Sequence, residues 1–356
     1  MEIILAENAG FCFGVDRAVR MTEEELSKTD SSVYSYGPLI HNPQAVKALE
    51  AKGLETIDRF EDISEGRIIV RSHGVPEETI NDIKELGLHL VDCTCPYVLA
   101  VHKKVRDYSS KGYSIVIIGD KDHPEVVGIN GWCENQAHIV NSAEDAKALP
   151  DLEKSCVVSQ TTNRLDKFLE LSGIVEEKSQ ETVLFNTICN ATKLRQEAAE
   201  EVAKKVDAMI VIGGKHSSNT IKLAEISSRH CKNVFHIETI EEFALQRLQN
   251  FNTIGITAGA STPDWIIKEA VKVMENYNKD EMMEAIESSF KRINRGDVLK
   301  GTVLYVTNNE VMVNINYKSD GIIDRSEISK EQDADPKELF KVGDEIDVYV
   351  MKLDDG

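Results

Sequence analysis

Residues 12–43 read CFGVDRAVRMTEEELSKTDSSVYSYGPLIHNP, and this pattern decides the class of fold. A cysteine precedes a helical pattern over residues 15–28, an apolar strand begins near Val33, and a polar loop at 41–43 opens a further helix. Short apolar runs rich in β-branched residues, such as IVIIGD (115–120), alternate with helical patterns along the chain. This alternation predicts an α/β fold with parallel strands.

The same order of elements recurs twice further along the chain. Cysteine, helical pattern and apolar strand follow one another again, and the strands begin 21, 20 and 20 residues after Cys12, Cys95 and Cys189. The next polar loops begin 29, 28 and 28 residues after those cysteines, at His41, His123 and Ser217. Matching offsets at successive landmarks indicate an internal repeat.

The repeat predicts three weakly similar α/β units, at about residues 1–92, 93–186 and 187–280. A third strand in each unit ends in another polar loop, at 72–74, 160–162 and 259–262. Ligands of open α/β sheets bind at the carboxyl ends of the strands. Units arranged around a common axis would therefore bring three thiolates together inside a shell of six loops.

Composition and charge disfavour several classes of protein. The 356 residues suggest two to three domains, and 41% apolar residues suffice for a globular core. The net charge of −20 disfavours broad binding of nucleic acid or anionic membranes. The sequence contains no secretory signal and no apolar run of bilayer length, which predicts a cytoplasmic protein without membrane contact. Seven cysteines, an odd number, predict metal binding or burial rather than a disulfide framework.

Three converging cysteines leave two kinds of metal site open. Zinc sites usually contain close Cys-x-x-Cys pairs, whereas Cys12 and Cys189 are solitary and the run 93–95 is too tight. An iron–sulfur cubane is normally held by four thiolates, so three would leave one iron open to a substrate. We interpret the cysteines at 93, 133, 156 and 231 as buried side chains.

The polar loops predict a ligand that carries phosphate. Loops that open helices present free backbone N–H groups and the positive end of the helix dipole. Their side-chain donors are His41, His73, His123, Ser217, Ser218, Asn219 and Ser261. Taken singly, the serines and the asparagine are typical helix caps. Glu125 follows His123 at a helix start, where it either stabilises the helix dipole or relays a proton to a leaving hydroxyl.

Nine motifs upstream of residue 264 resemble one enzyme family. They are GFCFGVDRA (10–18), YGPLIHNP (36–43), RSHGVP (71–76), CTCPYV (93–98), HPEV (123–126), SQTT (159–162), TICNATKLRQ (187–196), HSSNT (216–220) and GASTP (259–263). In this order they resemble the 4-hydroxy-3-methylbut-2-enyl diphosphate reductases, the IspH or LytB family of the methylerythritol phosphate pathway. The resemblance implies a trefoil of three α/β units around an oxygen-sensitive 4Fe–4S cluster. It also implies removal of the substrate hydroxyl to give isopentenyl and dimethylallyl diphosphate.

The resemblance further implies roles for individual residues. Cys12, Cys95 and Cys189 would ligate the cluster, with one iron left open. The substrate would be held by His41, His73, His123, Thr161, Ser217, Ser218, Asn219 and Ser261. Glu125 beside His123 would supply protons, and Thr161 would orient the substrate hydroxyl and the relay.

Two further expectations concern Cys93 and the electron donor. Cys93 stands where the family usually has another residue, which leaves a ligand swap open in damaged protein. Cys95 is favoured because it precedes Pro96, as the family ligand does. A reduced ferredoxin or flavodoxin would deliver the electrons, since no GxGxxG dinucleotide motif follows an early strand.

The end of the chain has a different pattern. A linker is predicted at 281–296, and residues 297–356 read as the short strands of an S1-type OB barrel. They resemble the S1 domains of ribosomal protein S1, with the last strand of such a domain absent, so a truncated domain is expected. Residues 295–356 contain 8 basic and 14 acidic side chains, which favours docking to a protein, such as a ribosomal partner, over RNA binding.

Two other functions stay open at this stage. The chain could be a ribosome- or RNA-associated protein whose cluster senses oxygen or iron. It could instead be a zinc-dependent phosphohydrolase. Iron and zinc content, dependence on a reductant and salt-sensitive RNA binding distinguish these functions.

Overall fold

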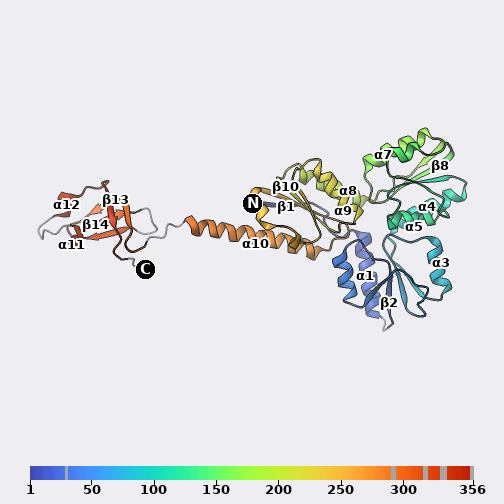
Figure 1. The fold of residues 1–356 in the computed structure, drawn as a ribbon, viewed down its shortest axis with the longest axis horizontal. Helices are drawn as coiled ribbons and strands as arrows, with labels where there is room; N and C mark the ends of the chain where they lie inside the picture. The colour runs from blue at the N-terminus through green and yellow to red at the C-terminus, as the bar shows by residue number, and fades with distance from the viewer. Residues whose placement is uncertain (29–30, 290–293, 316–319, 329–334, 353–356) are drawn as a thin grey trace. The chain divides into compact units, whose positions relative to one another are not determined.

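The computed structural model contains three parallel four-stranded sheets and one antiparallel four-stranded sheet (Figure 1). It describes the backbone of all residues except 29–30, 290–293, 316–319, 329–334 and 353–356. The side chains of residues 278–289 are likewise not described. The chain divides into two compact units, Met1–Glu275 and Asn276–Gly356. The α/β class predicted from the repeated pattern is confirmed.

The first sheet has the strand order β3-β2-β4-β5 and is parallel throughout. Its elements are α1 (Phe13–Lys28), β2 (Val33–Tyr36), α2 (Pro43–Glu50), β3 (Leu54–Ile57), β4 (Arg67–Val70), α3 (Glu77–Glu85) and β5 (His89–Asp92). Neighbouring residues of β4 enter different apolar clusters, because successive side chains of a strand point to opposite faces. Ile69 packs with Val33, whereas Ile68 packs with Ile83. Both faces of this sheet are therefore buried.

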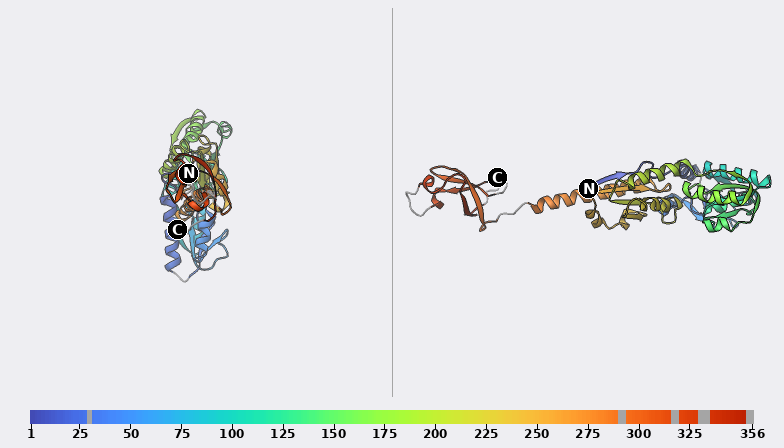
Figure 2. Two further views of the ribbon diagram at one scale, coloured as in Figure 1. Left: turned by 90° about the vertical axis from the view of Figure 1, so that its left-hand side faces the viewer. Right: turned by 90° about the horizontal axis from the view of Figure 1, so that it is seen from above.

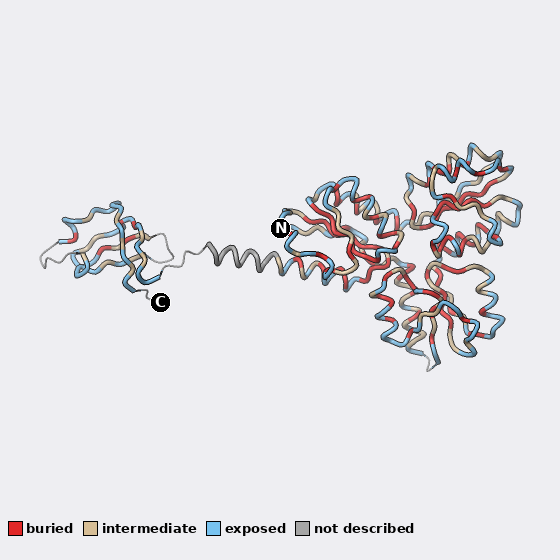
Figure 3. The backbone as a smooth tube through the Cα atoms, viewed as in Figure 1, coloured by how far each residue is buried: buried red, intermediate tan, exposed pale blue. Residues whose placement is uncertain are grey.

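The second sheet repeats this order as β7-β6-β8-β9. Its elements are α4 (Pro96–Ser110), β6 (Ser114–Ile118), α5 (Pro124–Gly131), β7 (His138–Val140), α6 (Ala143–Lys147), β8 (Leu152–Ser159), α7 (Leu165–Glu177) and β9 (Ser179–Leu184). Val157 and Val158 again face separate clusters on opposite sides of the sheet. Figure 3 shows buried residues concentrated along these strands.

The third sheet has the order β1-β12-β10-β11, so the first strand of the chain completes the last sheet of the repeat. Its elements are β1 (Glu2–Leu5), α8 (Asn190–Ala203), β10 (Ala208–Ile212), α9 (Ser218–Ser228), β11 (Val234–Ile237), η1 (Ile240–Glu242), η2 (Leu245–Asn250), β12 (Thr253–Ala258) and α10 (Asp264–Ser289). The predicted first unit at 1–92 therefore does not coincide with one sheet, because β1 belongs to the third sheet. There it occupies the edge position that β5 occupies in the first sheet and β9 in the second.

The C-terminal unit contains the antiparallel sheet β15-β14-β13-β16 (Figure 2). Its elements are β13 (Val298–Val306), β14 (Glu310–Asn314), β15 (Gly321–Asp324), α11 (Arg325–Ile328), α12 (Pro336–Leu339) and β16 (Glu345–Tyr349). Alternate residues of β14, Val311 and Val313, pack with Val303 as the period of two requires. Part of the predicted linker at 281–296 lies in α10, and 290–293 lie outside the described residues. Within the described chain, no helix combines the length and apolar character needed to cross a bilayer.

Candidate functional site

One cavity with about 670 Å³ of empty space, part of it open to solvent, gathers side chains from all three parallel-sheet units. All twelve residues predicted for the site line it, namely Cys12, His41, His73, Cys95, His123, Glu125, Thr161, Cys189, Ser217, Ser218, Asn219 and Ser261. Most of them follow strands or open helices, so the carboxyl ends of the parallel strands bring them together. Their convergence is observed, whereas their individual roles stay predictions.

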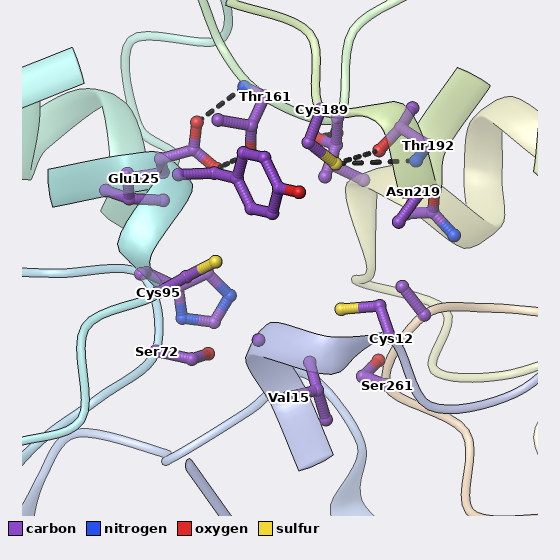
Figure 4. A pocket seen from close by; sticks show the side chains of 18 of the residues that line it. Cys12, Val15, Ser72, Cys95, Glu125, Thr161, Cys189, Thr192, Asn219 and Ser261 are labelled. Carbon is purple, nitrogen blue, oxygen red and sulfur yellow. Dashed lines mark hydrogen bonds between the residues drawn. The ribbon is translucent and has the colours of Figure 1, made fainter. Parts of the chain in front are cut away.

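Three cysteines face the cavity from the starts of three helices. Cys95 and Cys189 are the N-caps of α4 and α8, and the carbonyl oxygen of Cys12 accepts a 2.9 Å hydrogen bond from Asp16 N at the start of α1. Figure 4 shows the three sulfur atoms turned toward the same space. The positive end of each helix dipole stabilises negative charge on a thiolate or on a group it ligates.

Burial holds two of these thiols in the protonated form when no metal is bound. It raises the pKa of Cys95 to about 11, with Cys12 and Cys189 adding to the effect, and it also raises the pKa of Cys189. Metal binding deprotonates a coordinating thiol. Three free thiols directed into one cavity form a soft sulfur donor set, which fits an iron–sulfur cluster with one open iron.

Cys93 lies in a different environment from Cys95. It is fully buried in the apolar cluster that contains Val15 and Val33, and it does not line the cavity. Burial raises the pKa of the Cys93 thiol to about 12. A protonated thiol in an apolar core is inert, so Cys93 packs as a small apolar side chain.

Three histidines lie close together in the same cavity. The ring centroids of His41, His73 and His123 are 4.3 to 5.6 Å apart. Burial lowers the pKa of His41 to about 4 and of His123 to about 3, and it holds the pKa of His73 well below its usual range. Neutral imidazoles can donate an N–H to an anion or offer a lone pair to a metal ion.

Hydrogen bonding around these rings leaves donor positions available for a ligand. His123 Nδ1 accepts the backbone N–H of Glu125 at 3.1 Å, so the ring proton lies on Nε2. His41 Nε2 and His73 Nδ1 are buried and have no hydrogen-bond partner among the described residues. A buried polar atom without a hydrogen-bond partner lowers the stability of the fold unless a ligand forms the missing hydrogen bond.

The loop before α9 supplies further polar groups. Ser217 caps the helix by accepting the Thr220 N–H, as its residue type alone suggests. Asn219 is 3% exposed, and neither polar atom of its side-chain amide has a partner among the described residues. The capping role therefore accounts for Ser217 but not for Asn219, which is positioned to bind a ligand at a helix N-terminus.

Glu125 is buried at the start of α5 and is 2% exposed. Its Oε1 accepts the Thr161 N–H at 2.6 Å and its Oε2 accepts the Thr161 hydroxyl at 2.8 Å, as Figure 4 shows. Burial raises the pKa of Glu125, and the two bonds from Thr161 and the charge of Lys222 only partly oppose this. A raised pKa keeps a proton on the carboxyl group at higher pH, as a general acid requires.

Residues 3–275 match the family of the LytB protein. The chain belongs to the LytB protein family. Residues 292–356 match the S1 RNA binding domain. Both resemblances that the sequence motifs indicated are thereby confirmed.

Relatives in the LytB family are named 4-hydroxy-3-methylbut-2-enyl diphosphate reductases. The protein of Clostridium tetani is 47% identical over 358 residues, which are 99% of this chain but 56% of that protein. The chain thus spans little more than half of that relative. The protein of Caldanaerobacter subterraneus subsp. tengcongensis is 49% identical over 288 residues, 80% of this chain and 100% of that protein.

Two solved structures share the LytB-family fold. A structure of (E)-4-hydroxy-3-methyl-but-2-enyl diphosphate reductase, described as the terminal enzyme of the non-mevalonate pathway, is 43% identical. The match covers 78% of the present chain and 100% of the chain in that solved structure, with a TM-score of 0.60. The E-1-hydroxy-2-methyl-but-2-enyl-4-diphosphate reductase of Plasmodium falciparum is 31% identical and covers 76% and 87%, with a TM-score of 0.72.

Several cavity residues of this LytB-family chain lie in the quoted motifs but were given no role from the sequence. They include Gly14, Ser72, Thr162 and Arg195. Lys222 lies behind the lining and donates from Nζ to Ser218 Oγ at 2.9 Å. Helical spacing could have indicated two of them, because Arg195 follows Cys189 and Thr192 at steps of three, and Lys222 follows Ser218 at a step of four. Gly14 and Ser72 gave no such signal.

Gly14 allows α1 to approach Cys95. A Cβ at this position would lie 2.5 Å from Cys95 Sγ, so the sulfur would have to move. We expect Gly14→Ala to weaken iron binding by about tenfold, at the lower end of what changes around metal ligands typically cost. Iron retained in the presence of a chelator measures the effect.

Gly173→Ala is the matched control for this variant. It adds the same methyl group inside α7, where, apart from its chain neighbours and the backbone of the helix itself, no described atom lies within 4 Å of the new Cβ. Iron retention should not change, and helix propensity should stabilise the fold by up to ~1 kcal/mol. Equal iron retention by the two variants would contradict a role of Gly14 in placing Cys95.

Proposed function

We propose that the chain reduces (E)-4-hydroxy-3-methylbut-2-enyl diphosphate to isopentenyl and dimethylallyl diphosphate, the last step of the methylerythritol phosphate pathway. The reaction breaks the bond between carbon and the hydroxyl group. It consumes two electrons and two protons and releases one water for each product. The observation that carries this proposal is the convergence of three thiols, three neutral histidines and one buried carboxyl group on one cavity.

Cys12, Cys95 and Cys189 would hold a 4Fe–4S cluster in this cavity. When bound, the cluster supplies single electrons and an open iron that acts as a Lewis acid toward the substrate hydroxyl. The three helix starts favour the negative charge of the ligated thiolates. Among the described residues, these are the only cysteines that line the cavity, which supports one open iron.

The histidines and the α9 loop would bind the diphosphate. His41, His73 and His123 would donate from ring nitrogens, and Asn219 and the backbone at the start of α9 would add further donors. Lys222 and Arg71 would contribute positive charge, since both lower the pKa of His123 through their charge. Ser217, Ser218 and Ser261, which also line the cavity, would complete the site.

Glu125 and Thr161 would deliver the proton to the departing hydroxyl group. The Thr161 hydroxyl lines the cavity and donates to Oε2 of Glu125. When Glu125 is protonated, this hydroxyl would instead accept the carboxyl proton and donate its own hydrogen to the substrate hydroxyl, which it would also orient. His123 lies two residues before Glu125 and accepts its backbone N–H, which holds both groups at the start of α5.

Anaerobic purification of the full chain tests this function. We expect about four iron and four acid-labile sulfide per chain, the content of one cubane. Substrate should be converted to the two isomeric diphosphates only when a reductant such as dithionite with methyl viologen is present. A colourless protein with salt-sensitive RNA binding would instead support the RNA-associated alternative.

A zinc-dependent phosphohydrolase is the second candidate, because the ligand atoms of His41, His73 and His123 lie within 4.8 Å of one another. Three imidazoles are a common zinc donor set. The adjoining helix N-termini favour an anion over a cation at the same place. Stoichiometric zinc with release of phosphate in the absence of reductant would support the hydrolase and contradict the reductase.

The electron donor and the C-terminal unit complete the proposal. A reduced ferredoxin or flavodoxin would supply the electrons one at a time. The requirement for reduced thiols and a reduced cluster favours the cytoplasm. The S1-like unit would dock to a ribosomal partner, a role supported by the S1 match and by its acidic balance of 8 basic to 14 acidic residues.

Deletion of residues 295–356 should leave turnover with an artificial donor unchanged within about tenfold, or ~1.4 kcal/mol of barrier. All the cavity residues lie in the unit Met1–Glu275, and a relative is matched over its whole length by 288 residues of this chain. Turnover per cluster of the shortened and full chains, prepared together, measures the effect. A larger loss in a folded, cluster-containing chain would mean that the tail contributes to catalysis.

A further inference from the structure

Arg195 carries a buried positive charge beside the cysteine ligands. It lies in the motif at 187–196, but the proposed mechanism gives it no role. It lies on α8, six residues after Cys189, and is 3% exposed while lining the cavity. Its guanidinium donates to the carbonyl oxygens of Ala191 and Gly10, each at 2.8 Å. Gly10 precedes Cys12 by two residues, so Arg195 connects the segments that carry two of the three cysteines.

The charge of Arg195 is not neutralised by any group that the structure describes. No described carboxylate forms an ion pair with it, and its Nε is buried without a hydrogen-bond partner among the described residues. The acceptors of its other nitrogens are neutral carbonyls. An isolated buried charge is costly, so the cavity that Arg195 lines should receive a negative group.

The cysteine sulfurs are the groups that can supply this negative charge. Cys12 and Cys189 lie close enough to raise the pKa of Arg195, although burial has the larger effect and lowers it. When these thiols ligate iron they become thiolates, and each reduction of the cluster adds one negative charge. A fixed cation nearby stabilises the more negative state more strongly.

We propose that Arg195 is a positioning residue that supplies the counter-charge of the cluster held by Cys12, Cys95 and Cys189 and makes this cluster easier to reduce. This inference rests on the proposed function. One electron from the reductant enters the cluster, and Arg195 neither gains nor loses a proton. Net charge, hydrogen bonds and burial around a cluster are the features by which proteins set its potential.

The test compares four cluster-loaded full-length chains in an anaerobic redox titration followed by electron paramagnetic resonance. They are the natural chain, Arg195→Gln, Arg195→Lys and the control Arg67→Gln. Arg67 begins β4, at the end of the sheet away from the cavity, where it pairs with Glu25 at 2.6 Å. Removing its charge should therefore leave the cluster unchanged.

We expect Arg195→Gln to lower the ratio of reduced to oxidised cluster by about tenfold at a fixed solution potential, a shift of ~59 mV for one electron. Arg195→Lys keeps the charge but cannot donate to both carbonyls in the same planar geometry. Its ratio should stay within about threefold of the natural chain. If Arg195→Gln folds but loses iron while Arg195→Lys retains it, the result also supports the proposal, because the positive charge at this position is then what keeps the cluster bound.

Other outcomes overturn the inference. If Arg195→Gln retains iron with an unchanged ratio, Arg195 does not influence reduction. If the Gln and Lys variants are impaired equally, in ratio or in iron content, Arg195 only clamps the two segments through hydrogen bonds. A natural chain that holds zinc or no metal would overturn the proposed function as well, which separates the two failures.

Discussion

The Cys95→Ser variant is expected to lose the iron–sulfur cluster. A serine hydroxyl is a poor ligand for this cluster, and Cys95 is one of three thiols turned into the cavity from a helix start. Iron and acid-labile sulfide counts after anaerobic reconstitution, together with the visible absorption of the cluster, measure the loss. Because metal binding is coupled to folding, the variant should also unfold at a lower temperature than the loaded natural chain.

Cys93→Ser provides the control two residues away. Cys93 is fully buried, packs in the apolar cluster on one face of the first sheet and does not line the cavity. Its replacement should keep the cluster and cost stability only through a buried hydroxyl, about 1–3 kcal/mol if the hydroxyl finds no partner. Cluster loss from Cys93→Ser with retention in Cys95→Ser would show that the ligand assignment is wrong.

Glu125→Gln is expected to bind substrate, retain iron and lose at least about a hundredfold in turnover, because general acid catalysis typically contributes ~10²–10⁴-fold. The glutamine amide keeps the shape of the carboxyl group. Its oxygen can accept the Thr161 N–H, and its nitrogen can donate to the Thr161 hydroxyl in place of the present bond. The substitution removes the transferable proton and reverses the direction of the bond with the Thr161 hydroxyl. Single-turnover conversion of substrate under excess reductant, with iron content measured in parallel, reports the effect.

Glu78→Gln separates catalysis from helix stabilisation. Glu78 lies in the first turn of α3, as Glu125 lies in the first turn of α5, but it does not line the cavity. A dipole effect alone would make both variants lose ~0.3–1 kcal/mol of stability with little change in rate. Near-normal turnover of Glu125→Gln would mean that Glu125 only stabilises the helix dipole. The proton would then come from His123 or from water.

Local sequence patterns determined most of the side chains that line the cavity. The offsets from Cys12, Cys95 and Cys189 identified three similar units and the polar loops that follow their strands. Parallel strands carry these loops to one edge of each sheet, so all twelve predicted residues line the same cavity. The short strands read in residues 297–356 likewise predicted an S1-type barrel, and the C-terminal unit contains an antiparallel sheet.

Tertiary structure alone decided which distant segments meet. β1 joins the third sheet rather than the first because β12 leaves an edge that a parallel strand can fill. The sequence of a short apolar strand does not specify the strand with which it pairs. Only packing put Thr161 against Glu125, whereas the burial of Cys93 was already predicted from the sequence and is confirmed. Arg195 reaches Gly10 across 185 positions for the same reason, since a guanidinium pairs with whatever acceptor the assembled units place within its reach.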